Sequence, residues 1–154
     1  MSAAEKFKAA KEIVNKARAE ANQIVKEAFS EMAKTVFESN PDLKGFRWTQ
    51  YTPYFNDGDT CTFSANSDGP ELFHPRDEAN SYEDEDDDAE IGWIYDAYWY
   101  GEHKNLKSPL RKAYGDVKSF LSTFDDDDFL EMFGDHVRVT VTPEGVDVEE
   151  YDHD

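Results

Sequence analysis

The sequence has a single cysteine, Cys61, and no long apolar run. One cysteine can form neither an intramolecular disulfide nor a cysteine-rich zinc site, a usage that fits a reducing compartment. No stretch approaches the roughly 18 consecutive apolar residues that a membrane-spanning helix needs. The segment Met1 to Lys11 lacks the apolar core of a secretory signal peptide. We therefore expect a cytoplasmic protein without a membrane segment.

Basic residues are also scarce, with 16 Lys and Arg against 35 Asp and Glu and a net charge of -19. A chain this acidic repels phosphates, so we expect no direct binding to nucleic acid, and basic protein surfaces or cations are the natural complements. The charge is uneven. Residues 1–46 hold eight Lys and Arg and seven Asp and Glu, a net charge of +1. Residues 47–154 hold eight and 28, a net charge of -20.

The hydrophobic share is low, at 38%, but the chain contains 11 Phe, 8 Tyr and 3 Trp. Aromatic side chains bury large areas, so the sequence can form a core and is not disordered over most of its length. Its 154 residues suit one domain, 1–154.

Residues 3–38 are predicted to form one long amphipathic helix. No Gly or Pro interrupts the segment, and Asn40-Pro41 is expected to end it. Apolar residues recur at helical spacing. They are Phe7, Ala10, Val14, Ala17, Ala21 and Ile24, followed by Val25, Ala28, Phe29, Met32 and Val36. We interpret this helix as a cap on the core, and the alternative is that it pairs with a second copy in a homodimer.

Residues 46–64 are predicted to form a β-hairpin. Strand formers fill Phe46 to Phe55, and Thr60 to Phe63 are expected to return as the second strand. The turn between them is Asn56-Asp57-Gly58-Asp59, whose residue types tolerate positive φ. Pro53 indicates an edge position or a bulge.

The next two segments contrast in composition. Residues 65–90 read as an irregular acidic loop with Gly69-Pro70 and Pro75. Residues 91–100 are rich in aromatics and form either a strand or a short buried helix, because periodicity does not separate the two.

The last third of the chain is predicted to hold a second helix, a short helix and a C-terminal hairpin. Ser108-Pro109 is a helix start, followed by an apolar face from Leu110 to Phe124. The short helix runs from Phe129 to Phe133 and ends at Gly134. Alternating valines flank the turn Thr142–Gly145. The predicted fold is α+β, with the long N-terminal helix and a second helix packed on a small, mainly antiparallel sheet.

Acidic clusters are the main candidate for a binding site. They can be read as solvated loops and helix caps, or as a surface that imitates nucleic-acid phosphates and occupies a basic groove. The imitation requires that the fold gather them on one face. The residues concerned are Glu83, Asp84, Glu85, Asp86, Asp87, Asp88 and Glu90, then Asp125, Asp126, Asp127 and Asp128, with the acidic tail Asp147 to Asp154.

Catalytic and cofactor motifs are missing from the sequence. There is no GxSxG, P-loop or GxGxxG pattern, and no EF-hand spacing around Asn56–Asp59. The four histidines, His74, His103, His136 and His153, show no zinc spacing, so we expect no metal and no cofactor. An alternative is an enzyme or small-molecule binder with an aromatic cleft, whose residues would be Trp48, Tyr54, Trp93 and Trp99; such residues are more often core.

The segment from Phe46 to Phe63, FRWTQYTPYFNDGDTCTF, resembles a segment of uncharacterised proteins of tailed bacteriophages and some bacteria. The resemblance covers 18 residues and carries no catalytic roles. It implies a phage setting and a host component as the target. We therefore expect a non-enzymatic acidic protein that blocks a host protein through its acidic surface. A small-molecule binder or enzyme, and a structural or assembly protein, are the alternatives.

Overall fold

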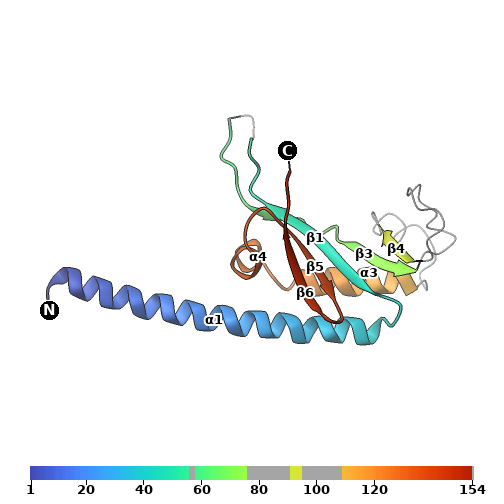
Figure 1. The fold of residues 1–154 in the computed structure, drawn as a ribbon, viewed down its shortest axis with the longest axis horizontal. Coiled ribbons are helices and arrows are strands. Elements are labelled where there is room, and N and C mark those ends of the chain that lie inside the picture. The colour runs from blue at the N-terminus through green and yellow to red at the C-terminus, as the bar shows by residue number, and fades with distance from the viewer. Residues whose placement is uncertain (56–57, 76–90, 95–108, 154) are drawn as a thin grey trace.

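The structure is a computed structural model that describes residues 1–55, 58–75, 91–94 and 109–153. It has the α+β fold that the sequence predicts: a long N-terminal helix, two further helices and a six-stranded, antiparallel sheet (Figure 1). The elements are α1 (Ala3–Ser39), β1 (Gly45–Tyr51), β2 (Ser64–Ala65), β3 (Glu71–Pro75), β4 (Ile91–Ile94), α3 (Pro109–Leu121), α4 (Asp126–Phe133), β5 (Val137–Thr142) and β6 (Gly145–Glu150).

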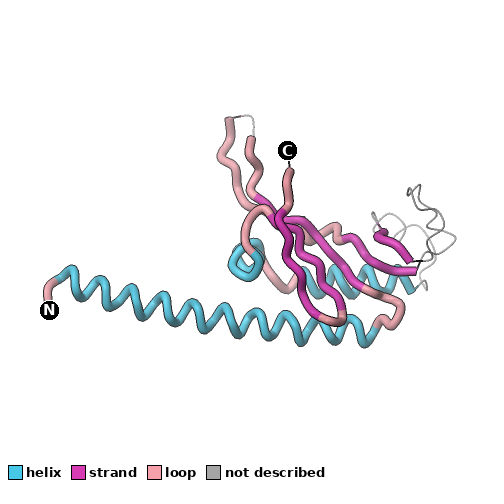
Figure 2. The backbone as a smooth tube through the Cα atoms, in the orientation of Figure 1, coloured by secondary structure: helices cyan, strands magenta, loops and turns pink. Residues whose placement is uncertain are grey.

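The sheet has the strand order β4-β3-β1-β5-β6, and β2 pairs with the end of β1. Helices α3 and α4 and the end of α1 pack on one of its faces (Figure 2). Successive side chains of a strand point to opposite faces. Phe46, Trp48 and Gln50 of β1 are therefore buried beneath the helices, while Arg47 and Thr49 lie on the open face.

Helix α1 spans the predicted segment, and the Asn40 amide closes it by donating to the carbonyl of Val36 at 2.8 Å. Its buried residues are confined to Phe29, Ala33, Val36 and Phe37. The interpretation of this helix as a cap on the core therefore holds for its last part alone. We call Ala3–Ala28 the arm and the rest of the described chain the head, and Figure 1 shows the arm extending away from the head.

The first hairpin is shorter than predicted. β1 ends at Tyr51 and pairs with β2 only through Gln50 and Tyr51, so the predicted strand at Thr60 to Phe63 is wrong. Pro53 lacks the backbone N–H that a ladder requires. Residues 52–55 and 58–63 instead project from the head without forming strands, and residues 56–57 of the predicted turn lie outside the described part of the chain.

The interpretation of residues 65–90 as irregular is also wrong in part, because Glu71–Pro75 forms β3 in the interior of the sheet. Residues 91–100 begin as a strand, since Ile91–Ile94 pairs with β3. Residues 95–100 are outside the described part.

The predicted C-terminal elements are confirmed. α3 buries the expected face, including Leu110, Val117 and Leu121. The short helix begins earlier than Phe129, because Asp125 caps it through a capping box with Asp128. The hairpin of β5 and β6 turns at Gly145.

Aromatic rings form the centre of the core. Phe29 is 1% exposed and lies 4.9 to 6.3 Å, centroid to centroid, from four other rings. Gln50 is also fully buried. Its amide nitrogen donates to the carbonyls of Phe129 and Gly134, at 2.9 and 2.7 Å, and its oxygen accepts from the Trp48 indole at 3.0 Å. The two bonds to Phe129 and Gly134 connect β1 to α4 and to its C-cap residue, while the Trp48 bond lies within β1.

Candidate functional site

The arm is an extended helical surface, and among its apolar side chains only Val25 packs against the core. Its large apolar side chains are exposed: Phe7 by 69%, Ile13 by 71%, Val14 by 52% and Ile24 by 66%. A cap residue begins the helix, since the Ser2 hydroxyl accepts from the backbone N–H of Glu5 at 3.2 Å. A helix of 26 residues is about 39 Å long at 1.5 Å per residue. The arm therefore presents a long amphipathic surface to solvent.

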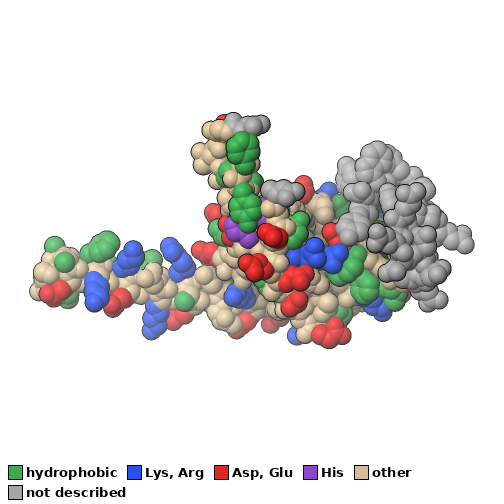
Figure 3. Space-filling view, turned by 45° about the horizontal axis from the view of Figure 1, so that its top comes forward, with side chains coloured by type: hydrophobic (Ala, Val, Ile, Leu, Met, Phe, Trp, Pro, Cys, Tyr) green, Lys and Arg blue, Asp and Glu red, His purple; other side chains and the backbone are tan. Residues whose placement is uncertain are grey.

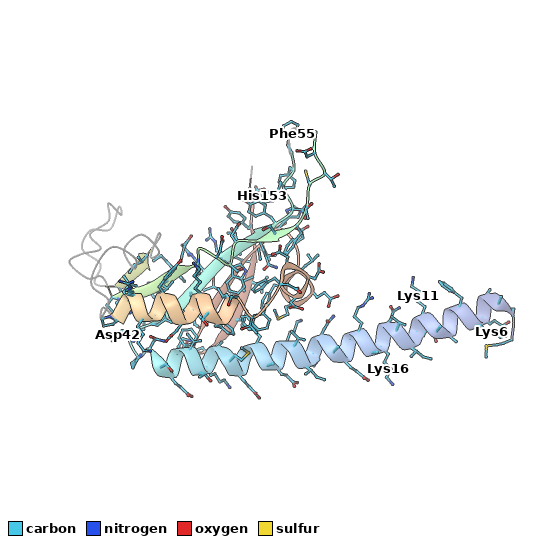
Figure 4. The ribbon with its side chains drawn as sticks, turned by 180° about the vertical axis from the view of Figure 1, so that it is seen from behind. Lys6, Lys11, Lys16, Asp42, Phe55 and His153 are labelled. Atoms are coloured by element: carbon cyan, nitrogen blue, oxygen red, sulfur yellow. The ribbon has the colours of Figure 1, made fainter. Side chains whose placement is uncertain are left out.

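Charge separates the arm from the head. The arm contains six Lys and Arg and four Asp and Glu, a net charge of +2, whereas residues 29–154 contain ten and 31, a net charge of -21. Figure 3 shows basic side chains along the arm and acidic ones spread over the described part of the head. In Figure 4, Lys6, Lys11 and Lys16 stand along the arm, remote from the head. One molecule thus carries two surfaces of opposite sign.

The structure describes the second acidic cluster and most of the third, but not the first. The residues Glu83 to Glu90 lie outside its described part, so their relation to the other clusters stays a prediction. In the second cluster, Asp125 and Asp128 form the capping box, and the Asp126 carboxylate accepts from the Ala65 N–H at 3.0 Å. Asp127, the fourth member of this cluster, is exposed. Most of this cluster therefore stabilises α4, as carboxylates do at a helix N-terminus.

The third cluster forms an exposed edge of the sheet. All six residues of β6 are exposed, among them Asp147, Glu149 and Glu150. Glu149 lies 3.5 Å from Arg138 on β5, and this is an ion pair at the surface. A row of carboxylates on an uncovered edge strand is accessible to a basic partner.

The proposed aromatic cleft is divided by the sheet. Trp48 is buried on the helix-covered face, whereas Trp93 lies on the open face, where the Arg47 guanidinium stacks 3.9 Å from its ring centroid. Tyr54 lies on the projecting loop, and Trp99 is outside the described residues. Trp48 and Trp93 cannot line a common cleft, because the strands separate them.

A cluster of histidine and tyrosine rings holds the base of the projecting loop. His153 stacks on Tyr51 at 3.9 Å and on Tyr54 at 4.2 Å between centroids. Nδ1 of His136 lies 2.7 Å from Nε2 of His153, so one of these nitrogens carries a hydrogen that the other accepts. Phe55, one residue beyond Tyr54, is 78% exposed and lies near the tip of the loop (Figure 4). The cluster orients the loop and leaves Phe55 in solvent.

Asp135 fastens the same region. Its carboxylate accepts from the backbone N–H and the hydroxyl of Thr52, at 2.8 and 2.7 Å, and from the N–H of His136 at 2.8 Å. Burial raises the pKa of Asp135, but these hydrogen bonds outweigh it, so the pKa lies below its ordinary value. The charged form is the one that holds the loop.

A hollow of about 270 Å³ lies between the end of α1 and the start of α3, beside His74. Nδ1 of His74 contacts the Pro75 carbonyl at 2.9 Å, while Nε2 has no hydrogen-bond partner among the described residues. Lys112 also lines the hollow, but its ammonium already donates to the Ser39 carbonyl, the Asn40 side chain and Asp116. The lysine therefore has no remaining donor for an anion in this hollow.

Asp116, at the other end of these contacts, accepts from Asn40 and Lys112, each at 2.9 Å. Burial raises its pKa, and the two hydrogen bonds and the charge of Lys112 more than reverse that effect, so the pKa is lowered. This group joins α3 to the end of α1 and is structural.

Sequence reasoning missed the histidine–tyrosine cluster. His136 and His153 are 17 positions apart and show no motif spacing. The predicted C-terminal hairpin could have indicated that the two histidines lie close together. Pairing β5 with β6 brings the residues after Glu150 back beside His136. Within the described residues, no group of three or more His, Cys, Asp or Glu side chains is placed to hold a metal ion.

No family model matches this sequence, and neither a curated protein nor a solved structure shows a significant match to it. Among the described helices, none combines the length and apolar character needed to cross a membrane.

Proposed function

We propose that the protein is a non-enzymatic interaction protein and that the arm is its association surface. One observation carries the proposal: Phe7, Val14 and Ile24 lie exposed at helical spacing on a helix that leaves the head. Burying apolar surface gains roughly 25 cal/mol per Å², so such a stripe is unfavourable in water until a partner covers it.

A pair of arm variants tests this function. Val14→Asp and Ile24→Asp place a charge in the stripe, and Ala19→Asp places the same charge on the opposite side of the helix as the matched control. We expect the Val14 and Ile24 variants to lose association, measured as mass at several concentrations and as proteins retained from a lysate, while the control keeps it. If wild type and all three variants have equal mass and retain the same proteins, the arm is not an association surface.

A second candidate function belongs to the acidic head. The exposed carboxylates of β6 and the net charge of -21 for residues 29–154 support binding to a basic surface of another protein. The inhibition of a host protein, the imitation of nucleic acid and the phage setting implied by Phe46 to Phe63 are parts of this candidate that stay predictions.

Neutralising one edge tests the second candidate. A variant with Asp147→Asn, Glu149→Gln and Glu150→Gln is compared with Glu12→Gln on the arm in capture from bacterial lysate at low and high salt. We expect the triple variant and high salt each to weaken capture, since exposed charges are screened within about 8 Å at physiological ionic strength. Capture that resists both changes would assign binding to another surface.

A further inference from the structure

Seven apolar residues of the arm follow a seven-residue repeat, and Ile13 and Val25 lie outside it. Phe7, Val14, Ala21 and Ala28 occupy one position of the repeat, and Ala10, Ala17 and Ile24 occupy another, three residues later. This is the a and d pattern of a two-helix coiled coil, in which the seam of one helix packs on the seam of another. The repeat covers three heptads, and four of its seven seam residues are Ala, which allow close approach of two helices.

The seam does not face the head of its own chain. At about 100° per residue, the seam is centred roughly 110° around the helix axis from the buried residues Phe29, Ala33, Val36 and Phe37. A second helix can therefore lie along the whole seam, on a side of α1 other than the one that packs on the head.

We infer that the occupant of the seam is the arm of a second copy, running antiparallel, so that each arm ends beside the head of its partner. This inference rests on the proposed function of the arm. Equal spacing allows a register in which Phe7 meets Ile24 of the second copy, Ala10 meets Ala21, and Val14 meets Ala17. In the same register Lys6 lies near Glu27 of the second copy.

Charge decides the direction. A parallel pair would set two heads, each of net charge -21, side by side. An antiparallel pair keeps the heads apart by about the 39 Å length of the arm, several times the screening length of about 8 Å. Within the arm, residues 3–11 carry three Lys and one Glu, a net charge of +2, while residues 12–28 are neutral. Antiparallel pairing therefore places the basic end of each arm against the acidic head of the other copy.

The same charges disfavour a lipid surface as the occupant. A helix with Lys and exposed apolar residues can bind an anionic membrane, and each basic residue near the surface contributes roughly 1 kcal/mol. Here the arm brings with it a head of net charge -21, which the membrane repels. The second copy offers an apolar seam together with the charge of the opposite sign.

Disulfide trapping tests the occupant and its direction together. Cys61 is first replaced by Ser, which removes the single native thiol. Two further variants then carry Ala10→Cys or Ala21→Cys, with Ala19→Cys on the outer side of the helix as the control for random collision. We expect a linked dimer when the Ala10 and Ala21 variants are mixed under oxidising conditions, and at least tenfold less when either is alone or when the control is used.

The possible outcomes are separable. Linkage of the Ala10 variant to itself, with a mass that doubles with concentration, would overturn the antiparallel direction and keep the proposed function. A protein of single-chain mass at every concentration that captures another protein through the arm would overturn the second copy and keep the arm as an association surface. Binding to anionic vesicles, lost in Ile24→Asp, would assign the seam to lipid and overturn the inference.

Discussion

Helix α1 runs through two environments without a break. Phe29 lies in the head among four aromatic rings, and Phe7 lies in the arm with 69% of its surface in water. The residue type, the helix and its backbone are the same, so the difference comes from what surrounds each side chain. This difference shows that helical periodicity alone does not distinguish a helix segment buried in the core from one that is exposed to solvent.

The largest effect should come from comparing these two phenylalanines. Phe29→Ala is expected to cost about 3–5 kcal/mol of unfolding free energy, because it leaves a cavity in a closed core. Phe7→Ala should change the unfolding of the dilute protein by less than about 0.5 kcal/mol, as surface substitutions do. Denaturant unfolding at low concentration measures both. Equal losses would mean that the arm packs on its own head.

A smaller loss is expected for Gln50→Ala. The substitution removes one buried side chain and leaves the Trp48 indole and the carbonyls of Phe129 and Gly134 without their partner. The expected cost is about 2–4 kcal/mol, since each unsatisfied buried group costs roughly 1–3 kcal/mol and α4 is able to adjust. Arm residues offer the contrast: Gln23→Ala removes only an exposed hydrogen bond to Glu27 and should be nearly neutral.

Removing residues 1–24, which include most of the arm, should change the stability of the head still less. A chain that begins at Val25 keeps every buried residue of α1, because Phe29 is the first of them. We expect the unfolding free energy to change by less than about 1 kcal/mol, while association through the arm is lost. Thermal unfolding measures the change in stability, and the mass in solution measures the loss of association. A truncated chain that unfolds would show that the arm contributes to folding.

The smallest expected effect is the pH dependence of the stability that Asp116 contributes. The lowered pKa of Asp116 means that its carboxylate stabilises the fold fully above the unfolded pKa, near pH 4, and that this contribution is lost as the pH falls through the folded pKa. The difference in unfolding midpoint between wild type and Asp116→Asn should therefore be largest at neutral pH and should close in acid. Glu12→Gln on the arm is the control and should show no such gap. If the difference in unfolding midpoint between wild type and Asp116→Asn were the same at every pH, the contacts with Asn40 and Lys112 would not depend on the charge of Asp116.

The sequence predicted the fold better than the site, for reasons that particular residues make clear. Capping and turn signals act locally. Pro109, Gly134 and Gly145 were therefore enough to predict α3, α4 and the C-terminal hairpin from the sequence. β3 was missed because its five residues include His74 and Pro75, which are uncommon in a central strand, and only the pairing partners β1 and β4 reveal it.

The candidate surfaces depend on long-range placement, which a sequence does not give. Trp48 and Trp93 have the same chemistry, but the sheet assigns them to opposite faces. Asp125 caps α4, as the sequence allowed, but the bond from the Ala65 N–H to Asp126 depends on a contact that the sequence does not indicate. The exposure of the arm follows from the size of the head, since α3 and α4 cover no more than the last turns of α1.

The acidic edge strand β6 has one more consequence. An uncovered edge presents unpaired backbone groups to any strand that approaches, which is the usual route to sheet extension and aggregation. Asp147, Glu149 and Glu150 place like charges along that edge, so two copies of β6 repel each other before their backbones can pair. The carboxylates of β6 therefore disfavour extension of the sheet through this edge.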